Sequence, residues 1–374
     1  MYVEAHELFE RFIDGLEAHP EASLVHSLAE PPRLGDFLEK LDPDLSLDWS
    51  AKDFQGLPSL RNKIIKRTGT DTNCVIGDVL VTAGTAEANF LAISQLVQPE
   101  DEMIVDVPGW QQPLVLGKAI GANVKHLYRY EDREWHFDLN ELEDLTTDRT
   151  KLIFLCNPNN PTGQVISENE LLDVVRIADR VGAYVLCDEV YAGLEWDGHA
   201  IPRIANLYEK GISTGSVSKV LGLQGLRAGW LICRDKELLY DAMVLRENTS
   251  EIMNIMGESI ADIALNDDYY PGALNRALCA GRTNLELLDK FIEHHKCLDW
   301  QIPAAGYIGF CRLQLDIESD EFVRQLMQAP YRTFVMPGTA YGYPCHIRLG
   351  VGGGTELSKG LERLKQYLHD LEAE

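Results

Sequence analysis

The apolar residues in the middle of the chain follow two alternating spacings. Short runs that are apolar at nearly every position, at 103–107, 152–156 and 184–187, predict buried strands. Between them, apolar residues recur every three or four positions, as in 86–97 and 168–181, and this spacing predicts helices. Strands without a polar face that alternate with helices favour a mostly parallel sheet covered on both faces. The sequence therefore predicts an α/β fold.

The same spacings predict further strands and a further helix in this region. Further strands are predicted at 78–82, 124–128, 212–216 and 229–233, and a further helix at 114–120.

The C-terminal third follows a different pattern. It has a long helical stretch over 235–291, broken near 270–272, then two strands around one helix, and a final amphipathic helix. The strands are expected at 308–315 and 346–349, and the helices at 320–327 and 355–371. This pattern predicts a smaller α+β unit, with which the start of the chain could pack. We expect a large domain over 49–265 and a small domain formed by 1–48 and 266–374.

Charge and hydropathy exclude several classes of function. The chain of 374 residues has 34 basic and 59 acidic side chains, which gives a net charge of −25. Such a charge repels nucleic acid, so a nucleic-acid partner is not expected. No apolar run reaches the ~20 residues of a membrane span, and 1–18 has the pattern of an amphipathic helix rather than that of a signal peptide. We expect a cytoplasmic protein that does not bind membranes.

The eight cysteines suggest neither disulfides nor a metal site. None forms a CxxC pair, and most lie in apolar stretches such as 152–156 and 184–187. A chain of this length can form a core without disulfide staples. We expect buried thiols, and no metal site is predicted.

The chemically most informative stretch lies at 216–229. It begins with Ser216, Val217, Ser218 and Lys219, and glycines and Arg227 follow. A lysine becomes a useful nucleophile when its position is fixed and its pKa is lowered. Arg227 could hold a phosphate group. Taken alone, the stretch could also be a solvated lysine in a glycine-rich loop.

Three other stretches follow predicted strands, where ligands bind in open α/β sheets. Residues 157–163 read NPNNPTG, which also fits a turn fixed by prolines. Asp188, in the sequence DEVY, could pair with a cationic ring nitrogen or cap a helix. Residues 82–87 (TAGTAE) precede a helix whose free N–H groups would suit a phosphate.

The order and context of these stretches resemble the class I/II aminotransferases, which are PLP-dependent enzymes of fold type I. The resemblance covers roughly 28–368, and its most specific parts are NPNNPTG, DEVY, and SVSK followed by Arg227. It implies a large domain with a mostly parallel sheet, a smaller α+β domain from both chain ends, and pyridoxal 5'-phosphate (PLP) as the cofactor. It also implies a homodimer with the active site at the dimer interface.

The resemblance assigns roles to individual residues. Lys219 matches the lysine that binds the cofactor aldehyde covalently and later moves the substrate proton. Asp188 matches the carboxylate that pairs with the pyridinium nitrogen. Tyr191 and Asn160 match the two donors to the phenolic oxygen, and Trp110 matches the aromatic side chain that stacks on the ring. The phosphate cradle is matched by Thr85, Ala86, Ser216 and Arg227, and Gly84 and Ser218 are also expected to contact the cofactor.

The substrate end is also assigned by the resemblance. Arg348 matches the arginine that holds the substrate α-carboxylate, where a bidentate pair would fix the amino acid. Asn160, Trp110 and Ala29 are expected to contact the substrate as well. The sequence GVGGG at 350–354 could form a flexible turn or a wall of small residues beside a bulky substrate.

Two positions depart from the family pattern. Ala51 stands where many members have a tyrosine, so that Trp49 or Phe54 could fill the space. Ala29 replaces the glycine of a common Gly-Glu-Pro sequence. Both departures fall at the substrate mouth rather than at the cofactor, so the cofactor is better supported than the reaction.

The resemblance predicts an enzyme that moves an amino group between an α-amino acid and a 2-oxo acid. A second interpretation stays open, in which the enzyme performs elimination, cyclisation or oxidation at the α-carbon. Similar departures occur in the capreomycidine synthases, which also carry a proline-glycine segment like that at 337–338. A non-enzymatic regulator with this fold is a third possibility, but no DNA-binding extension is recognised in this acidic chain.

Overall fold

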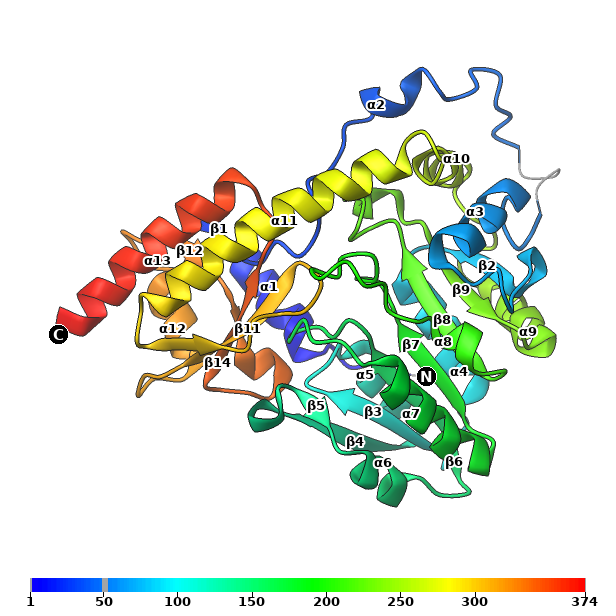
Figure 1. Ribbon diagram of the computed structural model, residues 1–374, viewed down its shortest axis with the longest axis horizontal. Coiled ribbons are helices and arrows are strands. Elements are labelled where there is room, and N and C mark those ends of the chain that lie inside the picture. The colour runs from blue at the N-terminus through cyan, green and yellow to red at the C-terminus, as the bar shows by residue number, and fades with distance from the viewer. Residues whose placement is uncertain (1, 49–52, 374) are drawn as a thin grey trace.

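The computed structural model describes residues 2–48 and 53–373. Figure 1 shows a large sheet in one part of the molecule, a smaller sheet in the other, and the long helix α11 (Tyr270–Glu293) extending from beside α10 in the larger part to the smaller part.

An eight-stranded sheet forms the larger part. In spatial order its strands are β2 (Val79–Thr82), β9 (Gly229–Cys233), β8 (Gly211–Ser216), β7 (Tyr184–Asp188), β6 (Thr150–Cys156), β3 (Glu102–Val107), β4 (Asn123–Tyr130) and β5 (His136–Phe137). The five strands from β8 to β4 run parallel, whereas β9, β2 and β5 pair antiparallel. The prediction of a mostly parallel sheet is therefore confirmed.

Helices cover both faces of this sheet. One face carries α4 (Thr85–Leu96), α5 (Gln112–Ile120) and α9 (Lys236–Glu247), and the other carries α6 (Leu139–Leu145), α7 (Glu168–Val181) and α8 (Ile204–Leu207). In β6, Leu152 and Phe154 pack toward α4, whereas Ile153 and Leu155 pack toward α7. A strand that is buried on both faces has no polar face, which explains the continuous apolar runs in the sequence.

The smaller part combines segments from near both ends of the chain. Its antiparallel sheet has the order β10 (Leu298–Trp300), β11 (Ile308–Leu313), β14 (His346–Gly350) and β13 (Met336–Pro337). β1 (Ala22–Ser23) pairs with β12 (Thr333–Phe334), which joins the start of the chain to its C-terminal third. The helices of this part are α1 (Glu7–Glu17), α12 (Ser319–Leu326) and α13 (Thr355–Ala373), with the 3-10 turn η4 (Gly338–Tyr341). The domains at 49–265 and at 1–48 plus 266–374 stay predictions.

The long helical stretch was placed correctly but divided wrongly. It forms α9, α10 (Ile255–Ala264) and α11, so the breaks lie at 248–254 and 265–269. Residues 270–272 are the first turn of α11, where Pro271 is tolerated because the first N–H groups of a helix have no partner within it. The sequence prediction placed no element at α2 (Gly35–Leu38), α3 (Pro58–Thr68), or the 3-10 turns η1 (Ile76–Asp78), η2 (Glu131–Arg133) and η3 (Gln224–Leu226).

Residues 351–354 form the expected turn before α13, and no glycine of 350–354 forms a wall beside the site, since none lines the cavity. The N–H groups of Gly350 and Gly352 donate to the carbonyls of Leu24 (2.7 Å) and His26 (2.9 Å). A Cβ on Gly350 would lie 2.3 Å from the His26 carbonyl oxygen, and one on Gly352 would lie 2.5 Å from that of Leu28. These glycines therefore let the N-terminal segment approach β14 closely.

The remaining sequence expectations concern cysteines and membranes. All eight cysteines are free, and six of them are buried. Within residues 2–48 and 53–373, no helix combines the length and the apolar character that crossing a membrane requires. The same residues contain no group of three or more His, Cys, Asp or Glu side chains that could hold a metal ion.

Candidate active site

A cavity of about 240 Å³ lies where β6, β7 and β8 end. Eleven of the thirteen predicted site residues line it: Thr85, Ala86, Trp110, Asn160, Asp188, Tyr191, Ser216, Ser218, Lys219, Arg227 and Arg348. The carboxyl ends of parallel strands meet at one edge of a sheet, so loops that are distant in sequence converge there.

Lys219 lies in the loop that follows β8, and its side chain points into this cavity. Its Nζ lies 3.2 Å from the Oγ of Ser27. Burial lowers the pKa of Lys219 to about 8, and the positive charges of Arg348 and Arg227 act in the same direction. A lysine with such a pKa has a sizeable fraction of neutral amine near neutral pH, which a nucleophile or base requires.

Asp188 is the last residue of β7 and is buried. Its Oδ2 accepts a hydrogen bond from Asn89 Nδ2 (2.9 Å), and its Oδ1 accepts one from the backbone N–H of Val190 (3.2 Å). Thr214 Oγ1 donates to Asn89 Oδ1 (2.8 Å), which orients the Asn89 amide so that its N–H₂ faces Asp188. Burial raises the pKa of Asp188 to about 6, so a cationic group placed beside it would be stabilised.

The first turn of α4 and Arg227 form a cradle for an anion. Gly84 precedes the helix at φ +83°, and a Cβ there would lie 2.4 Å from Arg227 Nη2, so a glycine is needed for the guanidinium to fit. Arg227 is held by the carbonyls of Ala83 (3.2 Å) and Gln224 (3.1 Å). The buried Oγ1 of Thr85 has no hydrogen-bond partner among the described residues. Free helix N–H groups, a guanidinium and an unpaired hydroxyl together suit a phosphate.

Arg348 lies in β14 and enters the cavity from the smaller part of the molecule. Its Nη1 donates to Tyr341 Oη (3.1 Å) and Asn160 Oδ1 (3.4 Å), and its Nη2 donates to the carbonyl of Val25 (3.2 Å). Its buried Nε has no partner among the described residues. This free donor fits the carboxylate of an incoming ligand.

Tyr341 contributes a hydroxyl that sequence reasoning did not identify. It also donates to Asn160 Oδ1 (3.3 Å). Because the Oδ1 of Asn160 accepts from both Tyr341 and Arg348, the amide nitrogen of Asn160 stays available to a ligand. The ring of Tyr341 also lines a larger cavity of about 620 Å³, which holds none of the predicted site residues.

The other predicted residues lie as follows. Tyr191 is almost fully buried, and burial raises the pKa of its phenol, which therefore stays protonated. The indole N–H of Trp110 donates to Gln112 Oε1 (3.3 Å). Ala29 does not line the cavity, so it is not placed for direct substrate contact; its N–H donates to the carbonyl of Lys219 (2.9 Å). Gly84 likewise lies behind the wall, against Arg227.

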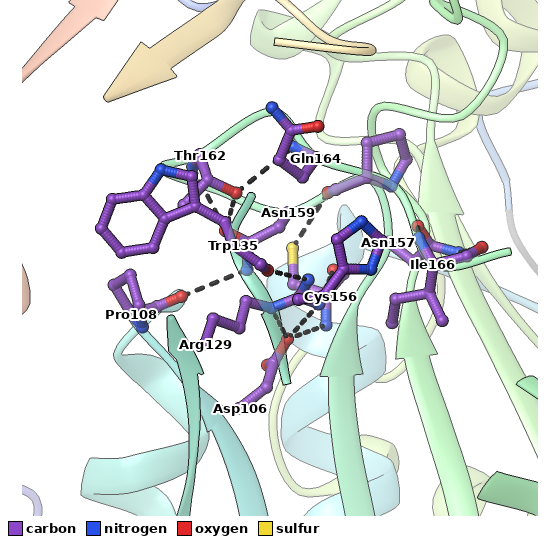
Figure 2. Close-up of polar contacts among 12 residues, drawn as sticks. Asp106, Pro108, Arg129, Trp135, Cys156, Asn157, Asn159, Thr162, Gln164 and Ile166 are labelled. Atoms are coloured by element: carbon purple, nitrogen blue, oxygen red, sulfur yellow. Dashed lines mark hydrogen bonds and ion pairs between the residues drawn. The ribbon is translucent and has the colours of Figure 1, made fainter. Parts of the chain in front are cut away.

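A buried ion pair lies below the NPNNPTG loop in Figure 2 and reaches Cys156, which lines the cavity. Arg129 donates to Asp106 Oδ2 from Nε (3.0 Å) and Nη2 (2.7 Å), and both side chains are almost fully buried. The same carboxylate oxygen accepts the N–H of Cys156 (3.3 Å), and Arg129 Nη1 donates to the carbonyl of Trp135 (3.2 Å). The pair thus ties β3 and β4 to the end of β6.

Figure 2 also shows how the NPNNPTG loop is attached to its neighbours. Asn159 Nδ2 donates to the carbonyl of Pro108 (3.2 Å), and Asn159 Oδ1 accepts from both the N–H (3.2 Å) and the hydroxyl (2.8 Å) of Thr162. The loops that carry Trp110 and Asn160 are therefore fixed to one another.

Several residues at the site were missed by sequence reasoning. Ser27, Cys156 and Gln224 line the cavity, and Asn89 lies directly behind it. Asn89 had a signal, because it is an amide within the apolar helical pattern of 86–97. Trp49 and Ala51 lie outside the described residues, and Phe54 does not line the cavity.

Comparison with known proteins decides the family. Residues 50–364 match the family described as aminotransferase class I and II. The chain belongs to this family. It is 25% identical over 369 residues to a tyrosine aminotransferase of Dictyostelium discoideum, covering 91% of this chain and 88% of that one. It is 26% identical to the capreomycidine synthase of Streptomyces vinaceus, covering 78% and 74%.

Solved structures agree with this assignment. A PLP-dependent aminotransferase from Streptococcus suis superposes with a TM-score of 0.91 at 28% identity and covers 99% of both chains. The PLP-dependent cyclase OrfR has the same fold, with a TM-score of 0.88 at 24% identity, and covers 99% of this chain and 98% of its own. The expected α/β architecture of fold type I is confirmed, and this aminotransferase-family chain is a PLP-dependent transferase.

The residues of this aminotransferase-family chain fit PLP. A primary amine of lowered pKa, a buried carboxylate for a cationic ring nitrogen and a cradle with an unpaired hydroxyl all face one cavity. These are the groups that an aldehyde, a pyridinium and a phosphate each require.

Proposed function

We propose that the protein transfers an amino group between an α-amino acid and a 2-oxo acid. The observation that carries the proposal is that a lysine amine of lowered pKa and an arginine with an unpaired buried Nε line the same cavity. The first can move a proton at a substrate carbon, and the second can hold a substrate carboxylate.

Each residue of the chain then has a defined task. Lys219 would anchor the cofactor and, once released, its Nζ would take the proton from the substrate α-carbon. When bound, PLP accepts the electron pair that this proton leaves behind. Asp188 would keep the ring nitrogen positively charged, because its buried carboxylate lacks any cationic side chain within hydrogen-bond distance among the described residues.

Three further residues would position the cofactor and the substrate. Arg227, with the first turn of α4, would hold the phosphate. Asn160 would donate its amide N–H to the phenolic oxygen, since its Oδ1 already accepts from Tyr341 and Arg348. Arg348 would bind the substrate carboxylate through its free Nε. A carboxylate fixed in this way sets which bond of the α-carbon faces the base.

A second candidate is another reaction at the α-carbon, such as cyclisation, elimination or oxidation. It is supported by the similarity to a capreomycidine synthase and by Ala29 at the position of the usual glycine. Both reactions begin with the same proton abstraction, so the cofactor residues do not distinguish them. They differ in whether a 2-oxo acid restores the cofactor.

An anaerobic absorbance titration with a panel of amino acids tests the proposal. Transamination is expected to convert the band of protein-bound PLP to that of the pyridoxamine form, and a 2-oxo acid should reverse the change. Recovery of the PLP band without any 2-oxo acid would instead support the second candidate. A protein that binds no PLP would contradict both.

Two further expectations belong to this proposal. The family relationship supports a homodimer, which sedimentation of the purified protein can test. Trp110 lines the cavity and suits an aromatic or otherwise bulky substrate, so the panel should include phenylalanine and tyrosine.

A further inference from the structure

Ser27 brings a hydroxyl group to the catalytic lysine from the other end of the chain. Its side chain is buried, lines the cavity, and places Oγ 3.2 Å from Lys219 Nζ. The same hydroxyl also hydrogen-bonds the side chain of Tyr191. In the part of the chain that the structure describes, no other side chain is hydrogen-bonded to Lys219 Nζ.

The backbone around Ser27 is anchored on both sides. Before it, the carbonyl of His26 accepts the N–H of Gly352 (2.9 Å). After it, the N–H of Ala29 donates to the carbonyl of Lys219 itself (2.9 Å). Because the segment is bonded to the backbone of the lysine it serves, the distance between Oγ and Nζ does not depend on a long flexible connection.

A hydroxyl is chemically suited to this place. It can donate to the lone pair of a neutral amine and can accept from an ammonium group, so it serves both states of Lys219. A carboxylate would hold the lysine in its charged form, and an alkyl group would leave it unrestrained. In the structure the amine of Lys219 donates to Ser27 Oγ (3.2 Å), and the phenol of Tyr191, whose pKa is raised by burial, stays protonated beside it.

We propose that Ser27 is a further catalytic residue, whose hydroxyl holds the free amine of Lys219 in position whenever the lysine is not bonded to the cofactor. This rests on the role of Lys219 in the proposed function. Two events need the amine in that free state: condensation with the PLP aldehyde, in which the C–N bond forms and water leaves, and removal of the substrate α-proton, which Nζ takes. Both depend on where Nζ lies, and both should slow when the hydroxyl is lost.

The test compares Ser27→Ala, Ser27→Thr and Ser94→Ala with the wild-type protein. Apo-protein is mixed with PLP, and the rate of loading is followed by absorbance; kcat and KM are then measured with the best amino acid of the panel. Ser94 is the matched control, because its Oγ is buried, lies in α4, and has no hydrogen-bond partner among the described residues.

Ser27→Ala is expected to lower the loading rate and kcat by roughly threefold to tenfold, the net effect of one lost hydrogen bond, with little change in KM. Ser27→Thr, which keeps the hydroxyl, should recover most of both rates, and Ser94→Ala should match the wild type. If Ser27 had only a structural role, Ser27→Thr should be the more impaired variant, because threonine changes the side-chain volume more than alanine does.

Two results would overturn the proposal for Ser27 alone. One is a Ser27→Ala protein that loads PLP and turns over at wild-type rates, and the other is a Ser27→Thr protein as impaired as Ser27→Ala. A wild-type protein that binds no PLP would instead overturn the proposed function, and this proposal with it.

Discussion

The two sides of the cavity are built in different ways. The side that would hold the cofactor consists of strand ends and the loops that follow them directly, as at Asp188 after β7 and Lys219 after β8. The side that would hold the substrate joins Arg348 in β14 to the carbonyl of Val25, more than three hundred residues away along the chain. The register of the sheet fixes the first side, whereas packing between the two chain ends fixes the second.

Substitutions on the two sides of the cavity should therefore have different effects. Changes on the cofactor side should abolish the chemistry or destabilise the fold, because its groups lie at or directly after strand ends of the sheet. Changes on the substrate side should alter affinity while leaving the fold and the cofactor in place. The following predictions test that separation.

The largest effect is expected from Lys219→Ala. Removing the amine removes both the covalent anchor and the base, so kcat should fall by roughly 10⁴-fold or more. The control is Lys210→Ala, a lysine at the opposite end of β8 whose Nζ donates to the carbonyl of Gly182 (2.8 Å). An active Lys219→Ala protein would contradict the mechanism; turnover and the absorbance of bound PLP measure the outcome.

The buried ion pair should dominate the stability of the cofactor side. Arg129→Met leaves the carboxylate of Asp106 buried and unpaired, which is expected to lower the free energy of unfolding by about 3–5 kcal/mol. Arg133→Met removes an exposed ion pair with Asp138 and should change stability little. Urea unfolding of both variants measures these free energies. Equal losses in the two variants would show that the Arg129–Asp106 pair contributes no more to stability than an exposed pair does.

The burial of Lys219 should be visible in the pH dependence of PLP loading. Only the neutral amine condenses with the aldehyde, and the pKa of Lys219 is lowered to about 8. The loading rate should therefore rise about tenfold per pH unit below pH 8 and level off above it. A rate that still rises up to pH 10 would mean that the amine keeps the pKa of an exposed lysine.

Tyr341→Phe should produce the smallest effect, and on the substrate side alone. Loss of its hydroxyl removes one partner each from Arg348 and Asn160, so KM for the amino acid should rise roughly threefold to tenfold with kcat nearly unchanged. Tyr343→Phe is the control, because its hydroxyl donates to the carbonyl of Arg129 (3.4 Å) instead. A fall in kcat as large as the rise in KM would show that changes on the substrate side also affect the chemical step.

The same contrast explains what the sequence could and could not predict. The runs 152–156 and 184–187, before Asn160 and Asp188, are apolar at nearly every position, so their ends, and hence the edge of the sheet where ligands bind, could be located directly. The identity of the cofactor came from the resemblance to a family, which the comparisons confirm. The spacing of the strands alone favoured a solvated loop lysine at Lys219 and a helix cap at Asp188.

The contacts of Ser27 and Tyr341 could not be predicted. Ser27 contacts Lys219 and Tyr341 contacts Asn160 from distant parts of the chain, and no periodicity in the sequence records which distant side chain will lie beside each. The resemblance assigned Ala29 to the substrate. The residue lies close to the site, but it does not line the cavity, and its N–H donates to the carbonyl of Lys219.

The two glycines of β14 and the turn after it have a consequence for how substrate choice can change. Gly350 and Gly352 hold the backbone that carries Ser27 and the carbonyl that binds Arg348, yet neither glycine lines the cavity. A single added methyl group at either position would displace the N-terminal segment and, with it, both groups. Divergence of specificity in such an enzyme can thus begin at residues that no substrate ever meets, while the strand ends that hold the cofactor stay unaltered.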